Sequence, residues 1–343
     1  MDPLQTPSDI LAKSYDAILF DLDGVIYIGT DAVAGVVPAI NDVQRNYSVA
    51  LTYVTNNASR SSQSVSEHLN ALGLVTTADD VVTSAQAGAA ELAKRIAPGS
   101  RVFVLGSKDL MHEVELVGLV PTQEFDLDVA ALIQGYWPDM PWRMLAQACA
   151  MISAGALWVA TNMDATIPTQ WGVAPGNGSM VQMLSTTLGR TPDVVAGKPE
   201  APLMMASVNR TGAKRALMVG DRLDTDILGA THINIDSLLV LSGVTTVSEL
   251  FLSPPALRPT FLGWDALALN EVQPAVVIVA GQLTCEQWRL DGESIVGSGD
   301  ILNAIRLCAV AVWQEKLTPG TATHELARRG FNATAVRLPE VTS

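Results

Sequence analysis

The chain has 343 residues, of which 48% are hydrophobic and 16% are charged, and its formal net charge at pH 7 is −14. This length predicts two or three domains, and the high apolar content excludes disorder as the default state. The excess of acidic residues argues against nucleic acid or an anionic membrane surface as the main partner.

The sequence shows no pattern typical of a secretory signal peptide or of a membrane-spanning segment. The first twenty residues lack a basic start followed by an apolar core, so we expect no signal peptide, and residues 1–13 are expected to form a loose leader. No apolar run reaches the length that spans a bilayer. Three scattered cysteines, Cys149, Cys285 and Cys308, are typical of buried thiols in a reducing compartment. We therefore expect a soluble, cytoplasmic protein with no membrane partner.

The first predicted elements alternate between strand and helix. The apolar run that begins at Ile18 predicts a buried strand that runs to Asp21 and is followed by Leu22-Asp23-Gly24. A helix over 37–46, a buried strand over 49–55 and a helix over 59–72 follow. This alternation at this spacing is typical of a doubly wound, Rossmann-like parallel sheet in an α/β protein.

The pattern then restarts and later resumes, which indicates one domain inserted into another. Residues 14–84 and 193–264 are predicted to form the catalytic core, and 85–192 to form an inserted α/β cap that closes over a site and excludes water. Residues 270–343 are predicted to form a small α+β appendage. It contains no catalytic constellation, so packing or oligomerisation is favoured over chemistry.

Polar side chains of complementary chemistry follow three predicted strands of the core. They are Asp21 and Asp23, Thr55-Asn56-Asn57, and Asp221, to which Lys198 adds a cation. Each alone has a plainer explanation: an acidic turn, an ordinary turn, acids at a helix start, or a solvated lysine in a loop. Together they indicate a site, because chemistry in open α/β sheets gathers beyond the carboxyl ends of the strands. Two acids so close could hold a divalent cation, or divide nucleophilic and proton-transfer work.

These segments closely resemble the four motifs of the haloacid dehalogenase-like (HAD) phosphatases: Asp21-x-Asp23-Gly24-Val25, Thr55-Asn56-Asn57, Lys198 before a proline, and Gly220-Asp221-x-x-x-Thr225-Asp226. The resemblance covers residues 14–264. Within the predicted cap, Ala160-Thr161-Asn162-x-Asp164-x-x-x-Pro168 and Pro175-Gly176-x-Gly178-Ser179 resemble the type-IIA cap of the NagD, or p-nitrophenylphosphatase, branch. Segments 54–60, 81–86 and 220–226 also look like the actinobacterial glycerol-3-phosphate phosphatases, which carry a similar C-terminal extension.

The resemblance implies a Mg²⁺-dependent phosphomonoester hydrolase. Asp21 would attack phosphorus and form an aspartyl-phosphate, and Asp23 would act as general acid and then as general base. The implied metal ligands are Asp21, the backbone carbonyl of Asp23 and Asp221. Asp226 is expected to hold metal-bound water or to order its loop, and Asp224 to be exposed.

The remaining motif residues would bind the phosphate. The Thr55 hydroxyl and the Asn56 backbone N–H, with Asn57 beside them, are implied to hold the phosphoryl oxygens. Lys198 would neutralise the charge of the phosphate and of the crowded carboxylates. The net charge of −14 is unfavourable for an anionic substrate as a whole, but these groups would make the local field at the site favourable.

The cap loop is implied to choose the substrate. Asn162 and Asp164 would contact substrate hydroxyls or organise the loop, and Ile167 stands where some relatives place a selector. Isoleucine offers no charge pairing, which disfavours a strongly anionic leaving group such as phosphoglycolate, although Arg190 or Arg60 could supply the charge. Nothing in the loop suggests contacts to a pyridoxal ring. Glycerol 3-phosphate is the expected substrate. Phosphoglycolate, pyridoxal phosphate, a nucleoside monophosphate or a sugar phosphate are the alternatives.

Two other classes of function stay open at this stage. A phosphotransferase or mutase would use much the same core, but the large insertion resembles phosphatases rather than small-capped mutases. A catalytically silent scaffold is disfavoured because no core motif residue is lost. Members of this branch often dimerise through their caps, so a homodimer and a monomer both stay open at this stage.

Overall fold

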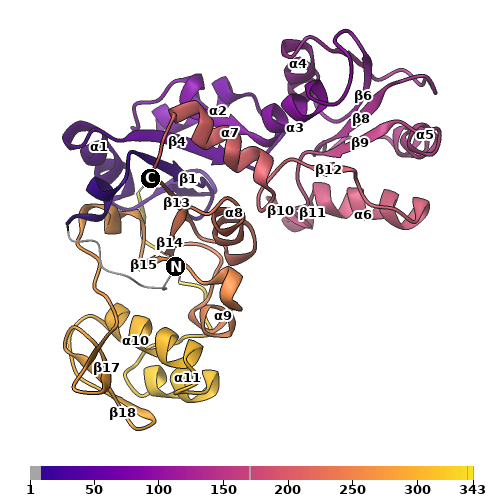
Figure 1. The fold of residues 1–343 in the computed structure, drawn as a ribbon. Coiled ribbons are helices and arrows are strands. Elements are labelled where there is room, and N and C mark those ends of the chain that lie inside the picture. The colour runs from indigo at the N-terminus through magenta and orange to yellow at the C-terminus, as the bar shows by residue number, and fades with distance from the viewer. Residues whose placement is uncertain (1–8, 170, 338, 343) are drawn as a thin grey trace. The chain divides into compact units, whose positions relative to one another are not determined.

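The structure is a computed structural model that describes residues 9–169, 171–337 and 339–342. Contacts divide the chain into two compact units, which are the described parts of 1–52, 71–75 and 211–343, and of 53–70 and 76–210. Figure 1 labels their helices and strands. Among the described residues, no helix combines the length and the apolar character that crossing a membrane requires.

The core is a six-stranded sheet in the order β15-β14-β13-β1-β4-β5. Its strands are β1 (Ala17–Phe20), β4 (Ala50–Thr55), β5 (Val81–Thr83), β13 (Ala216–Gly220), β14 (Asp236–Val240) and β15 (Phe261–Gly263). The pairings of β1 with β13, β13 with β14, β14 with β15 and β4 with β5 are all parallel. The central strand β1 is fully buried, as expected for a parallel strand covered on both faces.

The helices of this core alternate with its strands, as the sequence predicts. They are α1 (Val36–Asn46), α2 (Ser62–Ala71), α7 (Ala201–Thr211), α8 (Leu228–His232) and α9 (Val247–Leu252). A π-helical turn, Leu223–Ile227, directly precedes α8. Single π-turns are frequent at functional sites, and this one carries Asp226.

A second parallel sheet, of five strands in the order β12-β9-β8-β6-β7, lies in the unit formed by residues 53–70 and 76–210. Its elements are β6 (Arg101–Leu105), β7 (Val120–Thr122), β8 (Ala131–Gln134), β9 (Leu157–Ala160), β12 (Val194–Val195), α3 (Ser84–Ala93), α4 (Lys108–Leu116), α5 (Trp142–Ser153) and α6 (Asn177–Leu188). Alternate side chains of β6 enter different cores: Phe103 packs in the cluster with α5 and α6, and Val102 and Val104 pack in the cluster with α3 and α4. Helices therefore cover both faces of this sheet, and the predicted doubly wound fold with an α/β cap is confirmed.

Two antiparallel hairpins complete the loops near the predicted motifs. The segment after Asp23 forms β2 (Tyr27–Ile28) and β3 (Asp31–Val33). In the other unit, β10 (Thr166–Thr169) pairs with β11 (Gly172–Pro175). The sequence analysis anticipated neither hairpin, because both are too short to show an alternating pattern.

The predicted leader is not loose where the structure describes it. Residues 1–8 lie outside the described residues, but Leu11 begins a 3₁₀-turn that ends at Ser14, and both Leu11 and Ala12 are fully buried. The Leu11 N–H donates a 2.9 Å hydrogen bond to the carbonyl of Glu271. This part of the expectation was wrong, because the short apolar pair packs on the core.

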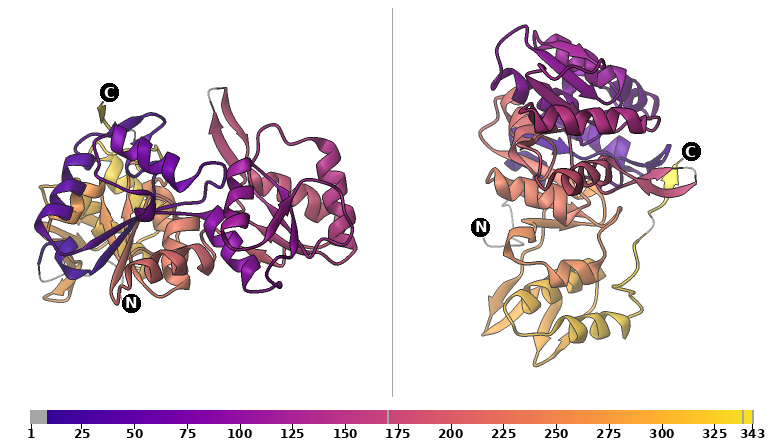
Figure 2. Two further views of the ribbon diagram at one scale, coloured as in Figure 1. Left: turned by 90° about the horizontal axis from the view of Figure 1, so that it is seen from above. Right: turned by 90° about the vertical axis from the view of Figure 1, so that its right-hand side faces the viewer.

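The C-terminal extension is an antiparallel sheet covered by two helices, α10 (Ile301–Trp313) and α11 (Pro319–Ala327). The strands are β16 (Val277–Val279), β17 (Gln282–Cys285), β18 (Trp288–Asp291) and β19 (Ser294–Val296). One hydrophobic cluster joins α10 and α11 to α9, β14 and β15. The chain then returns to the core, where β20 (Val341–Thr342) pairs with β3 (Figure 2). The extension is thus packed onto the core rather than tethered to it.

All three cysteines are free thiols. Cys285 and Cys308 are buried in the cluster that contains α10, and burial raises the pKa of each thiol to about 12. Cys149 is partly buried, and its pKa is also raised by burial. Thiols that stay protonated near neutral pH are poor nucleophiles, so these residues are packing groups, as the sequence predicts.

A buried arginine connects the extension to the core sheet. Arg306 on α10 is 4% exposed and donates to the Leu262 carbonyl of β15, to Gln273 Oε1 at 3.0 Å and to Asn303. Burial lowers its pKa, because the charged form loses contact with water. Neutral oxygens around a buried guanidinium satisfy its donors, and they would lose their own partners if it were removed.

We predict that Arg306→Ala lowers the free energy of unfolding by about 2–4 kcal/mol, because it leaves buried acceptors unsatisfied and opens a cavity. Urea denaturation measures this change. Arg289→Ala on the exposed side of β18 is the matched control, and it should change stability by less than ~0.5 kcal/mol. Equal effects of the two substitutions would contradict the assigned role of Arg306.

Candidate active site

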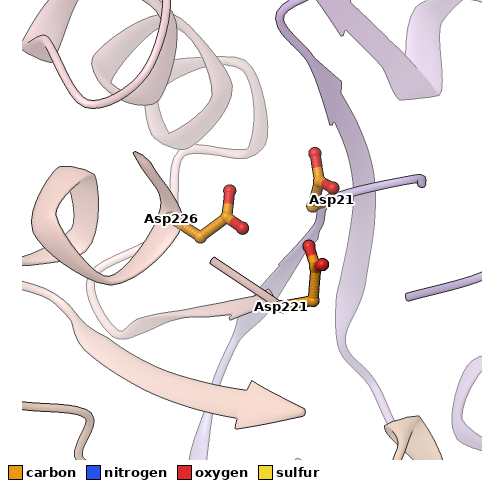
Figure 3. Close-up of side chains that lie close together, drawn as sticks. All are labelled: Asp21, Asp221 and Asp226. Carbon is orange, nitrogen blue, oxygen red and sulfur yellow. The ribbon is translucent and has the colours of Figure 1, made fainter. Parts of the chain in front are cut away.

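Three aspartates converge at the carboxyl ends of two neighbouring core strands. Asp21 follows β1, Asp221 follows β13, and Asp226 lies in the π-helical turn. One carboxylate oxygen from each lies within 4.8 Å of the others, and Figure 3 shows the three side chains pointing toward one another. Carboxylate oxygens are the ligands that hard divalent cations prefer, so this cluster could hold a metal ion.

The backbone around Asp221 leaves room for its carboxylate only because two neighbours are glycines. Oδ2 of Asp221 accepts a 2.7 Å hydrogen bond from the Val244 N–H. A Cβ at position 243 would lie 2.0 Å from this oxygen, and one at Gly24 would lie 2.6 Å away. Gly24 also has φ of +81°, a conformation that side chains disfavour. Gly243 and Val244 lie outside the motifs that indicate the site in the sequence, although a glycine shortly after β14 is a visible signal.

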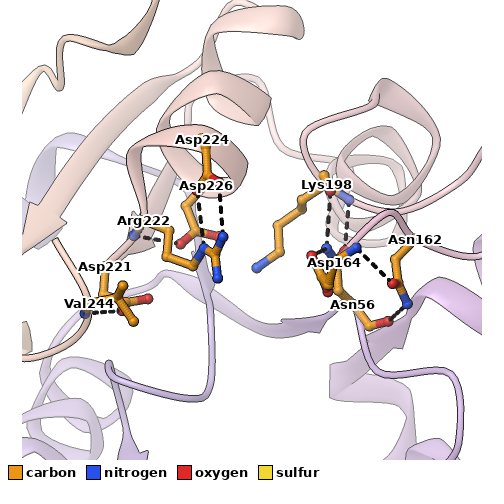
Figure 4. A network of polar contacts seen from close by, with 9 residues as sticks. All are labelled: Asn56, Asn162, Asp164, Lys198, Asp221, Arg222, Asp224, Asp226 and Val244. Carbon is orange, nitrogen blue, oxygen red and sulfur yellow. Dashed lines mark hydrogen bonds and ion pairs between the residues drawn. The ribbon is translucent and has the colours of Figure 1, made fainter. Parts of the chain in front are cut away.

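Asp226 is held from inside its own loop. It is fully buried, and its Oδ2 accepts a 3.1 Å hydrogen bond from the Arg222 N–H (Figure 4). Gly220 allows this approach, because a Cβ there would lie 2.2 Å from Cβ of Asp226. Asp224 is exposed and pairs with the Arg222 guanidinium. Asp226 therefore orders the loop while its carboxylate stays near Asp21 and Asp221.

Asp23 is more exposed to solvent than the three clustered aspartates. Asp21 is partly buried, whereas Asp23, two residues later, is exposed and enters the turn that leads to β2. The Gly24 N–H donates a 2.8 Å hydrogen bond to the Tyr27 carbonyl, which closes this turn. The carboxylate of Asp23 is therefore not one of the three that converge among the described residues.

The unit formed by residues 53–70 and 76–210 holds the predicted phosphate-binding residues Thr55, Asn57 and Lys198. Thr55 ends β4 in a buried position, and its Oγ1 accepts a 3.1 Å hydrogen bond from the Asn57 N–H. Oδ1 of Asn57 accepts from both the N–H and the hydroxyl of Ser59, so its side-chain oxygen serves a turn. Lys198 is 2% exposed, and its Nζ donates to the Val54 carbonyl at 3.5 Å.

The predicted cap-loop residues organise their own loop. Asn162 donates a 2.7 Å hydrogen bond to the Asn56 carbonyl and accepts one of 3.1 Å from the Asp164 N–H. Asp164 Oδ1 accepts from Asn56 Nδ2 at 3.1 Å. Ile167 lies outside this network, on β10 opposite Ala174 of β11. The Ser84 hydroxyl at the start of α3 also donates to the Asn56 carbonyl.

A parallel α/β core with an inserted α/β cap and aspartates at the ends of β1 and β13 defines a class of hydrolases. The family described as haloacid dehalogenase-like hydrolase matches residues 18–120, and the one described as HAD-hydrolase-like matches residues 195–267. The chain belongs to the haloacid dehalogenase-like hydrolases, as a type-IIA phosphatase of the NagD/p-nitrophenylphosphatase branch.

Three proteins illustrate which members of this family the chain is similar to. The chain is 40% identical to the D-glycerol 3-phosphate phosphatase of Mycobacterium tuberculosis, over 89% of this chain and 88% of that protein. The crystal structure of the glycerol phosphate phosphatase of that organism in complex with magnesium superposes with a TM-score of 0.80 at 41% identity, covering 89% of this chain and 92% of that one. An acid sugar phosphatase of Staphylococcus saprophyticus is 35% identical over 76% of this chain and 97% of that protein.

We predict that Gly243→Ala weakens binding of Mg²⁺ or Mn²⁺ at least about tenfold, because the added Cβ must displace the Asp221 carboxylate. Isothermal titration calorimetry of the metal measures the effect without any substrate. Gly320→Ala is the matched control, since a Cβ there meets only the Thr318 hydroxyl, at 3.9 Å. Unchanged metal affinity in Gly243→Ala would show that Asp221 is not a ligand.

Proposed function

We propose that this phosphatase hydrolyses a small phosphomonoester with Mg²⁺ and an aspartyl-phosphate on Asp21, and that its substrate is glycerol 3-phosphate, which yields glycerol and phosphate. The observation that carries the chemistry is the convergence of Asp21, Asp221 and Asp226 within 4.8 Å. The similarity to the mycobacterial D-glycerol 3-phosphate phosphatase supports the substrate.

The donor set suits magnesium. The three carboxylates supply oxygen ligands only, and the proposal adds the backbone carbonyl of Asp23. Asp226, already bonded to the Arg222 N–H, is assigned to metal-bound water and to loop order. When bound, Mg²⁺ offsets the repulsion between the Asp21 carboxylate and the phosphate dianion. The same charge stabilises three carboxylates that would otherwise repel one another.

The two residues of the first motif divide the chemistry. A carboxylate oxygen of Asp21 attacks phosphorus, and the bond to the leaving oxygen breaks while Asp23, as the acid, gives that oxygen its proton. Asp23, now a carboxylate, takes a proton from water as the water oxygen attacks the phosphoryl group. The second step releases phosphate and regenerates both aspartates. The exposure of Asp23 supports this role, because the leaving group and water must both reach it.

The proposal assigns the phosphoryl oxygens to Thr55, to the backbone N–H of Asn56 and to Lys198. Thr55 ends β4 and Asn56 follows it, so both stand at the carboxyl end of a parallel strand, where chemistry in open α/β sheets gathers. The burial of Lys198 supports a strong interaction with an anion, since a charge shielded from water interacts more strongly.

The substrate is the finer part of the proposal. Ile167 and the cap loop offer no cation at the selector position, which favours a neutral polyol over a second anionic group. A sugar phosphate is the second candidate, and the similarity to staphylococcal acid sugar phosphatases supports it. The three free thiols support a reducing, cytoplasmic setting for such metabolic work.

We expect Asp21→Asn to lower kcat for p-nitrophenyl phosphate about 10³-fold or more, because the amide cannot form the covalent intermediate. Removal of divalent metal with a chelator should abolish turnover of the wild type, and added Mg²⁺ should restore it. Colour release in a continuous assay measures both. Asp224→Asn, which changes an exposed aspartate of the same loop, is the control. Turnover that survives Asp21→Asn would refute the mechanism.

The substrate assignment predicts a kcat/KM for glycerol 3-phosphate at least about tenfold above that for glycerol 2-phosphate, sugar phosphates, phosphoglycolate, pyridoxal phosphate and nucleoside monophosphates. Phosphate release at fixed Mg²⁺ measures the series. A preference for sugar phosphates would keep the mechanism and replace the substrate by the second candidate.

A further inference from the structure

The side chain of Asn56 lies at the centre of a hydrogen-bond network that joins the lysine segment to the cap loop. Its Oδ1 accepts a 2.8 Å hydrogen bond from the Lys198 N–H, and its Nδ2 donates to the Lys198 carbonyl at 3.0 Å. The same Nδ2 donates to Asp164 Oδ1 at 3.1 Å. Figure 4 shows this amide between the backbone of Lys198 and the side chain of Asp164.

These contacts use both N–H donors of the Asn56 amide and engage its oxygen. The orientation of the amide follows from its partners: only an oxygen can accept from the Lys198 N–H, and only the NH₂ group can donate to a carbonyl and a carboxylate. Neither N–H is therefore left for a substrate. The side chain works on the protein, while the backbone N–H of the same residue is the proposed phosphate donor.

The surrounding backbone is shaped to let this amide approach. A Cβ on Gly197 would lie 2.6 Å from Asn56 Oδ1, so the glycine before the lysine leaves the space that the amide occupies. The Asn56 carbonyl is held as well, by the hydroxyl of Ser84 at 2.5 Å and by Nδ2 of Asn162 at 2.7 Å. Every polar group of this residue beyond its N–H thus contacts another segment.

The cap-loop end of the network is equally fixed. The Asp164 N–H donates to Asn162 Oδ1, and the Asp164 carbonyl accepts from the Gly178 N–H at 2.8 Å. Asn177 Nδ2 donates to the Asn162 carbonyl at 2.8 Å. A Cβ on Gly178 would lie 2.1 Å from the Met163 carbonyl, so a glycine is again required for the contact. The start of α6 therefore holds the loop that presents Asp164.

We propose that Asn56 is a positioning residue, whose amide sets the backbone of Lys198 and is itself oriented by Asp164, so that the cap loop controls the placement of the phosphate-binding lysine. Asp164 acts on this amide and not on the substrate. The inference rests on the proposed function, because it matters for catalysis only if Lys198 binds the phosphoryl group. It adds a coupling between the cap loop and that lysine.

The network predicts a specific pattern of loss and rescue. Asn56→Asp keeps an acceptor for the Lys198 N–H but removes both donors and places a second carboxylate beside Asp164, so we expect kcat to fall at least about tenfold. Asp164→Asn keeps a neutral acceptor, and we expect kcat to fall by about two- to fivefold. In the double variant, the amide introduced at position 164 can donate to the carboxylate introduced at position 56. The kcat of the double variant should therefore recover above that of Asn56→Asp alone.

The experiment uses p-nitrophenyl phosphate with Mg²⁺, so that it does not depend on the identity of the natural substrate. The wild type and Asp21→Asn are run first and test the proposed function by themselves. Thermal unfolding of each variant controls for loss of fold, and Asn57→Asp is the matched control, because Asn57 contacts Ser59 and neither Lys198 nor Asp164 in the described network. It should show no rescue by Asp164→Asn.

Recovery of kcat in the double variant supports the coupling, because a purely structural role for either residue gives independent losses. Losses that simply multiply in the double variant would overturn the proposal, as would wild-type kcat in Asn56→Asp. A rise in KM in Asp164→Asn, with no rescue of Asn56→Asp, would instead make Asp164 a substrate ligand and would also overturn it.

Discussion

The candidate active site depends on the close approach of the Asp21, Asp221 and Asp226 carboxylates near the ends of β1 and β13. Like charges at this distance repel, and two of the three are buried, so the arrangement needs both a compensating cation and a backbone that leaves room. The parallel pairing of Phe20 with Val219 brings the two strand ends side by side. Gly24 and Gly243 then make the space around Asp221, and the π-helical turn directs Asp226 inward. These local conditions produce a carboxylate cluster that could hold a metal ion.

In the unit formed by residues 53–70 and 76–210, a neutral amide is held in place by several segments in a similar way. Asn56 is satisfied by the Lys198 backbone and by Asp164, and glycines at 197 and 178 allow the close approach. A fully engaged polar network in a partly buried place is rigid, because breaking any member leaves a costly unsatisfied group. Asn162 and Asp164, for which the sequence left substrate contact and loop organisation both open, make hydrogen bonds within this network. Rigidity here suits the phosphate-binding role that is proposed for Lys198.

Much of this could be predicted from the sequence. The buried run before Asp21, the alternation of strand and helix and the four motifs were enough for the fold class, because parallel strands read as continuous apolar runs. The hairpins β2–β3 and β10–β11 were missed, since strands of two to four residues show no period. Gly243, Gly197 and the side chain of Asn56 were missed for another reason: their roles depend on contacts between segments distant in the chain. Leu11 and Ala12 were misjudged because a two-residue apolar contact gives no pattern.

The most direct test of the account is to locate the phosphoryl group during turnover. The wild type is mixed with substrate and Mg²⁺, quenched in acid within the first turnovers, digested and analysed by mass spectrometry. The account predicts a phosphorylated peptide whose modification maps to Asp21, which disappears in Asp21→Asn and when the metal is removed. Steady turnover with no phosphorylated aspartate, or with the group on another residue, would contradict it.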